Sequence, residues 1–250
     1  MFTPDIHTPS VLDAAEPSEE IFDRHFGDFA DGQVKNRQLQ PFSVVPPIMY
    51  QADEAVDPRP VLAIFCFEDG GSVVGQFVRK LAAALATRQL NVHVFARKSF
   101  EVAGAPLHIV GDAHDGDLFD QVQGFARRAG NEFLRLFRPA SAPITLLGCE
   151  WSAVPVMTTL QGIKNVSFLW SVHCLERQRS NTFGELSSRI EEIELVGLRT
   201  AKSILIHDPA TADAAKSCVP ECGERIVNAR HFFLVAHFNT IGVPGQINAR

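Results

Sequence analysis

From residue 59 onward, short apolar runs of strand length alternate with longer segments of helical periodicity. The first run, residues 61–67, is apolar at every position, as expected for a parallel strand that is buried on both faces of its sheet. Apolar side chains then recur at helical spacing: Val74, Phe77, Val78, Leu81 and Leu85. A second strand is expected at residues 92–95. Because parallel strands need a connection that packs back on the sheet, residues 61–95 predict a strand-helix-strand unit.

The same alternation continues along the rest of the chain. Further strands are expected at residues 107–110, 144–147, 166–170, 203–206 and 225–227, and further helices at residues 118–137, 153–161, 184–200 and 210–217. Strands that alternate with helices build a parallel sheet with helices on both faces. The sequence therefore predicts an α/β fold with a doubly wound, largely parallel sheet of about seven strands, of the Rossmann-like kind.

Residues 1–58 have a different composition from the rest of the chain. They contain seven of the 15 prolines, with 11 acidic and three basic residues, whereas residues 59–250 contain 18 acidic and 20 basic residues. Proline-rich, acidic segments with few apolar residues do not bury enough surface to fold. We expect residues 1–58 to form a largely extended or disordered leader, with one short helix near residues 19–29, and residues 59–250 to form one folded domain.

Charge, hydropathy and cysteine content exclude several functions. The near-neutral body has no basic stripe, so we expect no nucleic-acid binding. No run approaches the roughly 20 apolar residues of a membrane span, and the N-terminus lacks the features of a signal peptide, so we expect a cytoplasmic protein. Cys218 and Cys222 lack partners that would complete a zinc site, so no metal is predicted. Helix-end packing and a surface redox pair both remain open for these two cysteines.

Three loops follow expected strands, at the sheet edge where ligands bind in open parallel sheets. The first loop contains Glu68, Asp69, Gly70, Gly71 and Ser72. Paired glycines let the backbone approach a ligand, and the next helix offers unpaired amides. The spacing matches neither a dinucleotide fingerprint nor a phosphate loop, so neither NAD nor ATP is predicted. The structural alternative is a tight turn in which Ser72 or Asp69 caps the helix.

The other two loops carry groups suited to a sugar. Glu150 and Trp151 follow residues 144–147; the carboxylate can accept hydroxyl hydrogen bonds, and the indole can pack on a sugar face. Alternatively, Glu150 or Ser152 caps a helix and Trp151 lies in the core. His173 follows residues 166–170 and precedes three charged residues: Glu176, Arg177 and Arg179. A lone histidine is either structural or an acid-base group.

Taken in order, these segments resemble the N-terminal domain of retaining glycosyltransferases of the two-Rossmann-domain (GT-B) type, in the glycogen/starch-synthase and sucrose-synthase-like group. The loop at residues 68–71 and its helix are similar to the Gly-Gly loop and first helix of that group. Residues 149–151 stand where the family commonly has His-Asp-Trp. Residues 171–173 stand where it commonly has Thr-x-His. The resemblance covers about residues 59–250.

The resemblance implies roles for the residues of the three loops. Gly70, Gly71 and Ser72 would border the phosphates of a nucleotide sugar, and His173 would line the reaction centre as the catalytic residue. The remaining candidates would bind substrate: Glu68, Asp69, Glu150, Trp151, Glu176, Arg177 and Arg179.

Two departures from the family pattern bear on function. The family has a lysine before the glycine pair, whereas Glu68 and Asp69 would repel a diphosphate unless a cation compensates. Residues 238–250 resemble the approach to a second, nucleotide-sugar-binding Rossmann domain, which we expect to be absent from this chain.

We therefore expect the acceptor-side domain of a glycosyltransferase. It would transfer a sugar from a nucleotide sugar to a sugar or glycan acceptor, without another cofactor, only when a second domain or partner chain completes the site. A homo-oligomer is the other expected assembly. The alternative is a non-catalytic, glycosyltransferase-derived binding or assembly protein. A third hypothesis is an unrelated small-molecule enzyme that uses the same sheet edge, because doubly wound sheets support many chemistries.

Overall fold

A computed structural model describes residues 59–86, 90–111, 116–137, 143–179 and 184–229. The chain divides into two units, Met1–Gln38 and Leu39–Arg250, and all of the described residues belong to the second unit. The predictions for the leader at residues 1–58, for its short helix near residues 19–29 and for residues 238–250 lie outside the described part of the chain.

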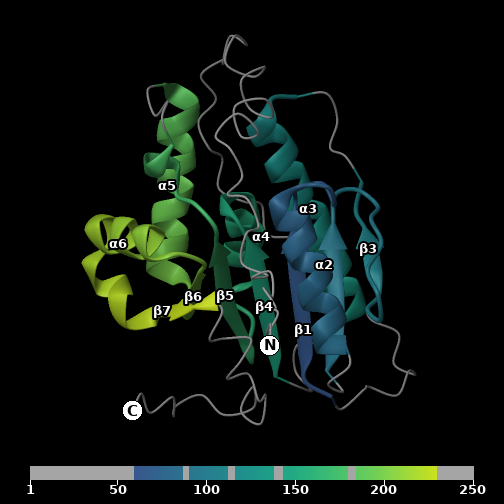
Figure 1. Ribbon diagram of the computed structural model, residues 1–250. Helices are drawn as coiled ribbons and strands as arrows, with labels where there is room; N and C mark the ends of the chain where they lie inside the picture. The colour runs from purple at the N-terminus through teal and green to yellow at the C-terminus, as the bar shows by residue number, and fades with distance from the viewer. Residues whose placement is uncertain (1–58, 87–89, 112–115, 138–142, 180–183, 230–250) are drawn as a thin grey trace, which may run out of the picture. The chain divides into compact units, whose positions relative to one another are not determined.

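Seven parallel strands form one sheet in the order β3-β2-β1-β4-β5-β6-β7 (Figure 1). The strands are β1 (Val61–Cys66), β2 (Asn91–Ala96), β3 (Leu107–Ile109), β4 (Ile144–Cys149), β5 (Val166–Val172), β6 (Ser203–Ile206) and β7 (Ile226–Asn228). Every strand pair in this sheet is parallel. The predicted α/β fold, with its doubly wound sheet of about seven strands, is confirmed.

Two central strands continue beyond the apolar runs that predicted them. β4 includes Gly148 and Cys149, which pair with Trp170 and Ser171 of β5. The backbone ladder rather than side-chain hydropathy sets these ends, because parallel strands pair through main-chain groups. As a result, the residues that follow β4 and β5 leave the sheet at its carboxyl edge, next to each other.

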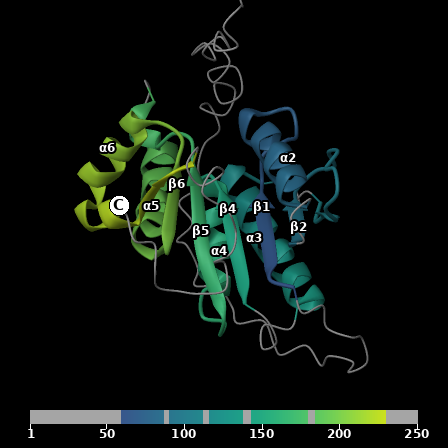
Figure 2. The same ribbon diagram turned by 60° about the horizontal axis from the view of Figure 1, so that its bottom comes forward.

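Helices lie on both faces of the sheet (Figures 1 and 2). α2 (Val73–Ala86) packs its apolar stripe on one face, over β1 and β2. The opposite face is covered by α3 (Leu118–Leu136), α4 (Val154–Leu160), α5 (Glu185–Thr200) and α6 (Pro209–Cys218). None of the described helices is both long enough and apolar enough to cross a membrane.

The strand order reverses between β1 and β4. The chain runs outward from β1 through β2 to β3, then returns to the other side of β1 and continues from β4 to β7. In open α/β sheets, ligands bind beyond the carboxyl ends of the strands at such a switch point. The loops that follow β1 and β4 border this point, and the loop after β5 is adjacent to them.

Candidate functional site

Glu150 and His173 form a hydrogen-bonded pair at the carboxyl edge of the sheet. Oε1 of Glu150 lies 2.7 Å from Nδ1 of His173 and accepts from the His173 backbone N–H at 2.8 Å. Both side chains are largely buried, at 8% exposed for Glu150 and 17% for His173. The structure therefore brings together the second and third loops predicted from the sequence.

The backbone of Glu150 is held in an unusual conformation to make this contact. Its φ is +64°, in the left-handed region that residues other than glycine rarely occupy. The amide of Glu150 donates to the Ser171 carbonyl at 2.9 Å, and its carbonyl accepts from Nε1 of Trp170 at 3.0 Å. These bonds turn the Glu150 carboxylate toward His173. The side chain of Glu150 makes no capping hydrogen bond to a helix, so the alternative prediction that Glu150 caps a helix is wrong.

The pair has the geometry of an oriented acid-base group. A carboxylate only accepts hydrogen bonds, so this contact places a hydrogen on Nδ1 of His173, and in the uncharged ring Nε2 then carries the lone pair. A neighbouring carboxylate also stabilises the imidazolium that forms when Nε2 accepts a proton. His173 can therefore take a proton from a hydroxyl group, or return one, at Nε2.

His207, which the sequence analysis did not select, completes the surroundings of His173. It follows β6, and its ring stacks on that of His173 with centroids 3.8 Å apart and planes 12° apart. Nε2 of His207 lies 3.0 Å from the Ser171 hydroxyl, and Phe77 of α2 meets both imidazoles edge-on. Burial and the neighbouring His173 lower the pKa of His207 to about 3. The sequence feature that could have selected His207 is its position directly after an expected strand, at the same sheet edge as the three selected loops.

Glu68 lies at the end of β1 beside this pair. Its Oε1 accepts a hydrogen bond from the Ser152 hydroxyl at 2.7 Å, which joins the first loop to the second. Burial, and then the charge of Glu150, raise the pKa of Glu68 to about 7. Ser152 thus contacts Glu68 instead of capping a helix. The Glu68 carboxyl titrates near neutral pH at the switch point.

In the first loop (the Gly-Gly loop, residues 68–72), one side chain caps α2 and the aspartate forms ion pairs with two cations. Ser72 accepts from the Gly75 amide at 2.9 Å, so it caps α2 as the structural alternative predicted. Asp69 pairs with Arg97 at 3.1 Å and with Lys98 at 3.3 Å. These two cations, which follow β2, offset the negative charge that the sequence placed beside the glycines.

Gly71 of this loop and Gly75, in the first turn of α2, differ in how much space surrounds them. A Cβ at Gly75 would lie 2.7 Å from the Gly70 Cα and would also overlap the Asp69 carbonyl, whereas a Cβ at Gly71 meets nothing within 4 Å. We expect Gly75→Ala to lower the free energy of unfolding by roughly 1–3 kcal/mol, because backbone atoms would have to move. Gly71→Ala should change it by less than about 0.5 kcal/mol.

Urea unfolding of the two variants and the wild type checks this prediction. Equal midpoints for Gly75→Ala and Gly71→Ala would show that the loop does not pack tightly against the start of α2.

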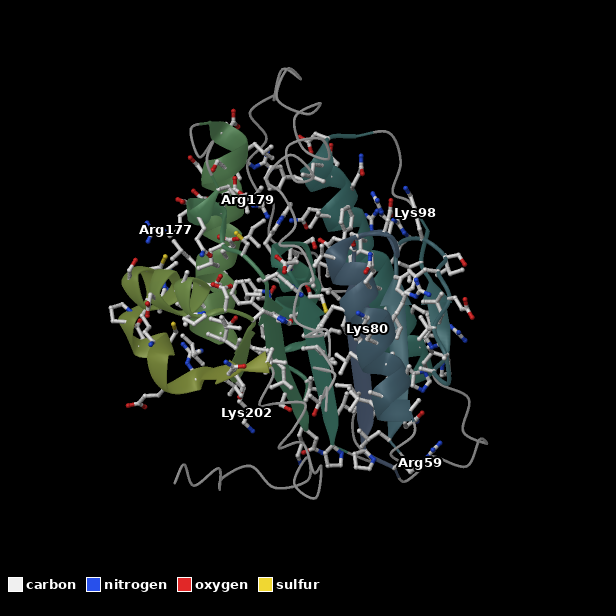
Figure 3. All side chains as sticks on the ribbon, viewed as in Figure 1. Arg59, Lys80, Lys98, Arg177, Arg179 and Lys202 are labelled. Atoms are coloured by element: carbon white, nitrogen blue, oxygen red, sulfur yellow. The ribbon has the colours of Figure 1, made fainter. Side chains whose placement is uncertain are left out.

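The third loop is fixed to the helices beyond it. Both carboxylate oxygens of Glu194, on α5, accept from the Glu176 amide at 3.0 Å, and Glu176 pairs with Arg179 at 2.9 Å. Arg177 turns toward α6, where it contacts Ser217 and Cys218. The predicted substrate-binding residues Glu176, Arg177 and Arg179 are therefore engaged within the domain in this structure. Figure 3 labels Arg177 and Arg179 near the carboxyl edge, and Lys202 and Arg59 near the opposite edge.

Glu194 should make stability depend on pH. Burial raises its pKa from 4.5 to about 8. A carboxyl whose folded-state pKa is raised stabilises the fold fully below pH 4.5, and this contribution is lost as the pH rises toward 8. We expect Glu194→Gln to match the wild type near pH 4 and to be more stable near pH 8.5.

Urea unfolding at several pH values measures this difference. Glu192→Gln is the matched control, because Glu192 is exposed on the same helix and should give no comparable trend. A gap between Glu194→Gln and the wild type that stays constant from pH 4 to pH 8.5 would contradict the prediction.

Trp151 and the cysteines lie apart from these polar contacts. Trp151 is 3% exposed and packs on Phe119 of α3, so the structure places it in the core and its ring offers no face to a sugar. All five cysteines are free, and Cys222 is fully buried behind α6, as helix-end packing predicts. Within the described segments, no group of three His, Cys, Asp or Glu side chains is placed to hold a metal ion.

The order of the strands and the polar edge define the class of this domain: a Rossmann-like α/β domain with its candidate site at the switch point. No protein-family model matches the sequence, and no curated protein matches it either. Among solved structures, the chain is similar to sucrose-phosphate synthase from Thermosynechococcus elongatus, with a TM-score of 0.52 and 16% identity. It is also similar to the catalytic domain of starch synthase IV from Arabidopsis thaliana bound to ADP and acarbose, with a TM-score of 0.50 and 11% identity.

These likenesses cover parts of each protein. The first covers 63% of this chain and 44% of the synthase chain, and the second covers 69% and 51%. The chain thus spans about half the length of either structure. The resemblance to glycosyltransferases that the sequence indicated is confirmed at the level of the fold.

Proposed function

We propose that this chain is the acceptor-side domain of a glycosyltransferase. The observation that carries the proposal is the Glu150–His173 pair, held at the switch point beside the Gly-Gly loop. A second Rossmann-like domain, in a partner chain or a longer polypeptide, would complete the site and bind most of the nucleotide sugar. The donor is a substrate, and no further cofactor is needed.

The chemistry of the pair supports an acceptor with hydroxyl groups. Nε2 of His173 accepts a hydrogen bond from an acceptor hydroxyl and takes up its proton as the glycosidic bond forms. The bond between the donor sugar and its phosphate breaks, and the nucleoside diphosphate leaves. Glu68, joined to the second loop through Ser152, offers a further acceptor for sugar hydroxyls.

The first loop supports a place for the donor phosphates. Gly71 has open space where a side chain would lie, so a phosphate can approach its backbone closely. Arg97 and Lys98 hold Asp69, which reduces the repulsion between this loop and an anionic donor.

A transfer assay with the full chain tests the proposal. UDP-glucose, ADP-glucose and GDP-mannose are each incubated with mono- and oligosaccharide acceptors, with and without a second Rossmann domain supplied as a separate polypeptide. We expect nucleoside diphosphate release that requires both the acceptor and the second domain. The proposal is overturned if no combination gives release and no sugar shifts the ring resonances of His173 in NMR spectra.

The alternative is a non-catalytic assembly protein, which would need an apolar surface for its partner. Among the described residues, the exposed large apolar side chains are Val73 of α2, Ile109 of β3 and Val196 of α5. A stoichiometric complex that survives substitution of His173, with no transfer activity in the same preparation, would favour this alternative.

A further inference from the structure

His207 contacts the ring of His173 but has no role in the proposed function. The two rings are nearly parallel, with planes 12° apart and centroids 3.8 Å apart. The two histidines leave the carboxyl ends of neighbouring strands, β5 and β6, which pair through Val172 and Ile206. The stack is therefore built on the central sheet rather than on a loop remote from it.

Two further contacts fix the orientation of the His207 ring. Its Nε2 lies 3.0 Å from the hydroxyl of Ser171, a fully buried residue of β5. Phe77 of α2 meets the His207 ring at 4.8 Å and the His173 ring at 5.1 Å, perpendicular to both within 8°. Phe77 lies on the helix that begins at the Gly-Gly loop, so this helix also contributes to the arrangement.

Among the described residues, none forms a hydrogen bond with Nε2 of His173. Glu150 holds Nδ1, His207 covers one face and Phe77 contacts the ring edge-on. The carbonyl of His173 accepts from the Thr211 hydroxyl of α6 at 3.3 Å, which fixes the backbone. Without His207, the imidazole would have an open face and could rotate away from Glu150.

We propose that His207 is a positioning residue, whose ring stacks on His173 and keeps Nδ1 directed at Glu150 and Nε2 directed at the acceptor. This inference rests on the proposed function for the identity of the acceptor. The half-buried ring of His207 stays uncharged across the neutral range, because partial burial and the nearby His173 lower its pKa to about 3. An uncharged ring face also attracts the imidazolium that forms when His173 accepts a proton.

Two substitutions separate stacking from the other contacts of His207. His207→Phe keeps a flat ring but loses the contact with Ser171, whereas His207→Ala removes the ring. We expect His207→Phe to keep transfer within about threefold of the wild type, and His207→Ala to lower kcat about tenfold with little change in the acceptor KM. Thermal unfolding of both variants reports whether they fold.

NMR of the full chain labelled with 15N-histidine gives a readout that needs no sugar. The ring nitrogen shifts of His173 should report one tautomer, with hydrogen on Nδ1, in the wild type and in His207→Phe. In folded His207→Ala, the same signals should move to the averaged shifts of two tautomers. An unchanged His173 spectrum in folded His207→Ala would overturn the positioning role. If the spectra are as expected but neither the wild type nor either variant transfers a sugar, the proposed function is rejected and the positioning role of His207 is not.

Discussion

Replacing His173 with asparagine is expected to lower the rate of sugar transfer by roughly 100- to 10,000-fold, which is the usual contribution of a general acid-base group. Nδ2 of asparagine occupies the place of Nδ1 and can still donate to Glu150, so the pair is kept in part. The variant lacks an atom equivalent to Nε2, which is the nitrogen that we propose accepts the proton of the acceptor hydroxyl. The loss should therefore appear in kcat, measured as nucleoside diphosphate release from the completed site.

His173→Gln is the matched control for this prediction. Its amide reaches toward the Nε2 position but cannot accept a proton, so acceptor binding should be affected less than turnover. Urea midpoints of both variants close to that of the wild type would show that the fold is intact. Activity of His173→Asn within threefold of the wild type would show that Nε2 takes no part in the transfer.

Replacing Trp170 with alanine is expected to lower the free energy of unfolding by about 3–5 kcal/mol, because a large, fully buried side chain is removed from the core. α5 packs tightly on this indole: a Cβ at Gly197 would lie 2.9 Å from two of its ring carbons. The substitution also removes the hydrogen bond from Nε1 to the Glu150 carbonyl. The left-handed backbone of Glu150 would then lose one of the contacts that hold it.

Trp170→Phe separates these two effects. It keeps most of the packing volume but cannot donate to Glu150, so its loss of stability should be clearly smaller than that of Trp170→Ala. Urea unfolding curves analysed with a common slope give both values. If the two variants lose the same free energy, the hydrogen bond and not the packing dominates the contribution of Trp170.

The positions of most strands and helices follow from patterns that are local in the sequence, whereas the order of the strands in the sheet does not. The all-apolar run at residues 61–67 required burial on both faces, and helical spacing after Gly71 required a crossover connection. The ends of β4 and β5 could not be predicted in this way. Gly148 and Ser171 have little preference for strands, and they extend them because the neighbouring backbone continues the ladder.

The candidate site was predicted in part, for a similar reason. The rule that ligands bind at the carboxyl edge selected Glu68, Glu150 and His173, and the structure brings them to one place. Trp151 was predicted to bind substrate but lies in the core, because the sequence around a tryptophan that follows a strand does not show whether the indole faces a ligand or the core. His207 was missed because its partner is 34 positions away in the sequence, and only the pairing of β5 with β6 brings the two rings together.

The titration of Glu68 near neutral pH links ligand binding to proton exchange. Its pKa of about 7 leaves the carboxyl part protonated and part ionised in ordinary buffers. An anionic phosphate placed beside it favours the protonated form, so binding takes up protons from solution; a sugar that donates hydroxyl hydrogen bonds favours the ionised form, so binding releases them. Calorimetry in buffers of different ionisation enthalpy measures the sign directly. The direction of proton flow thus identifies which substrate lies against Glu68.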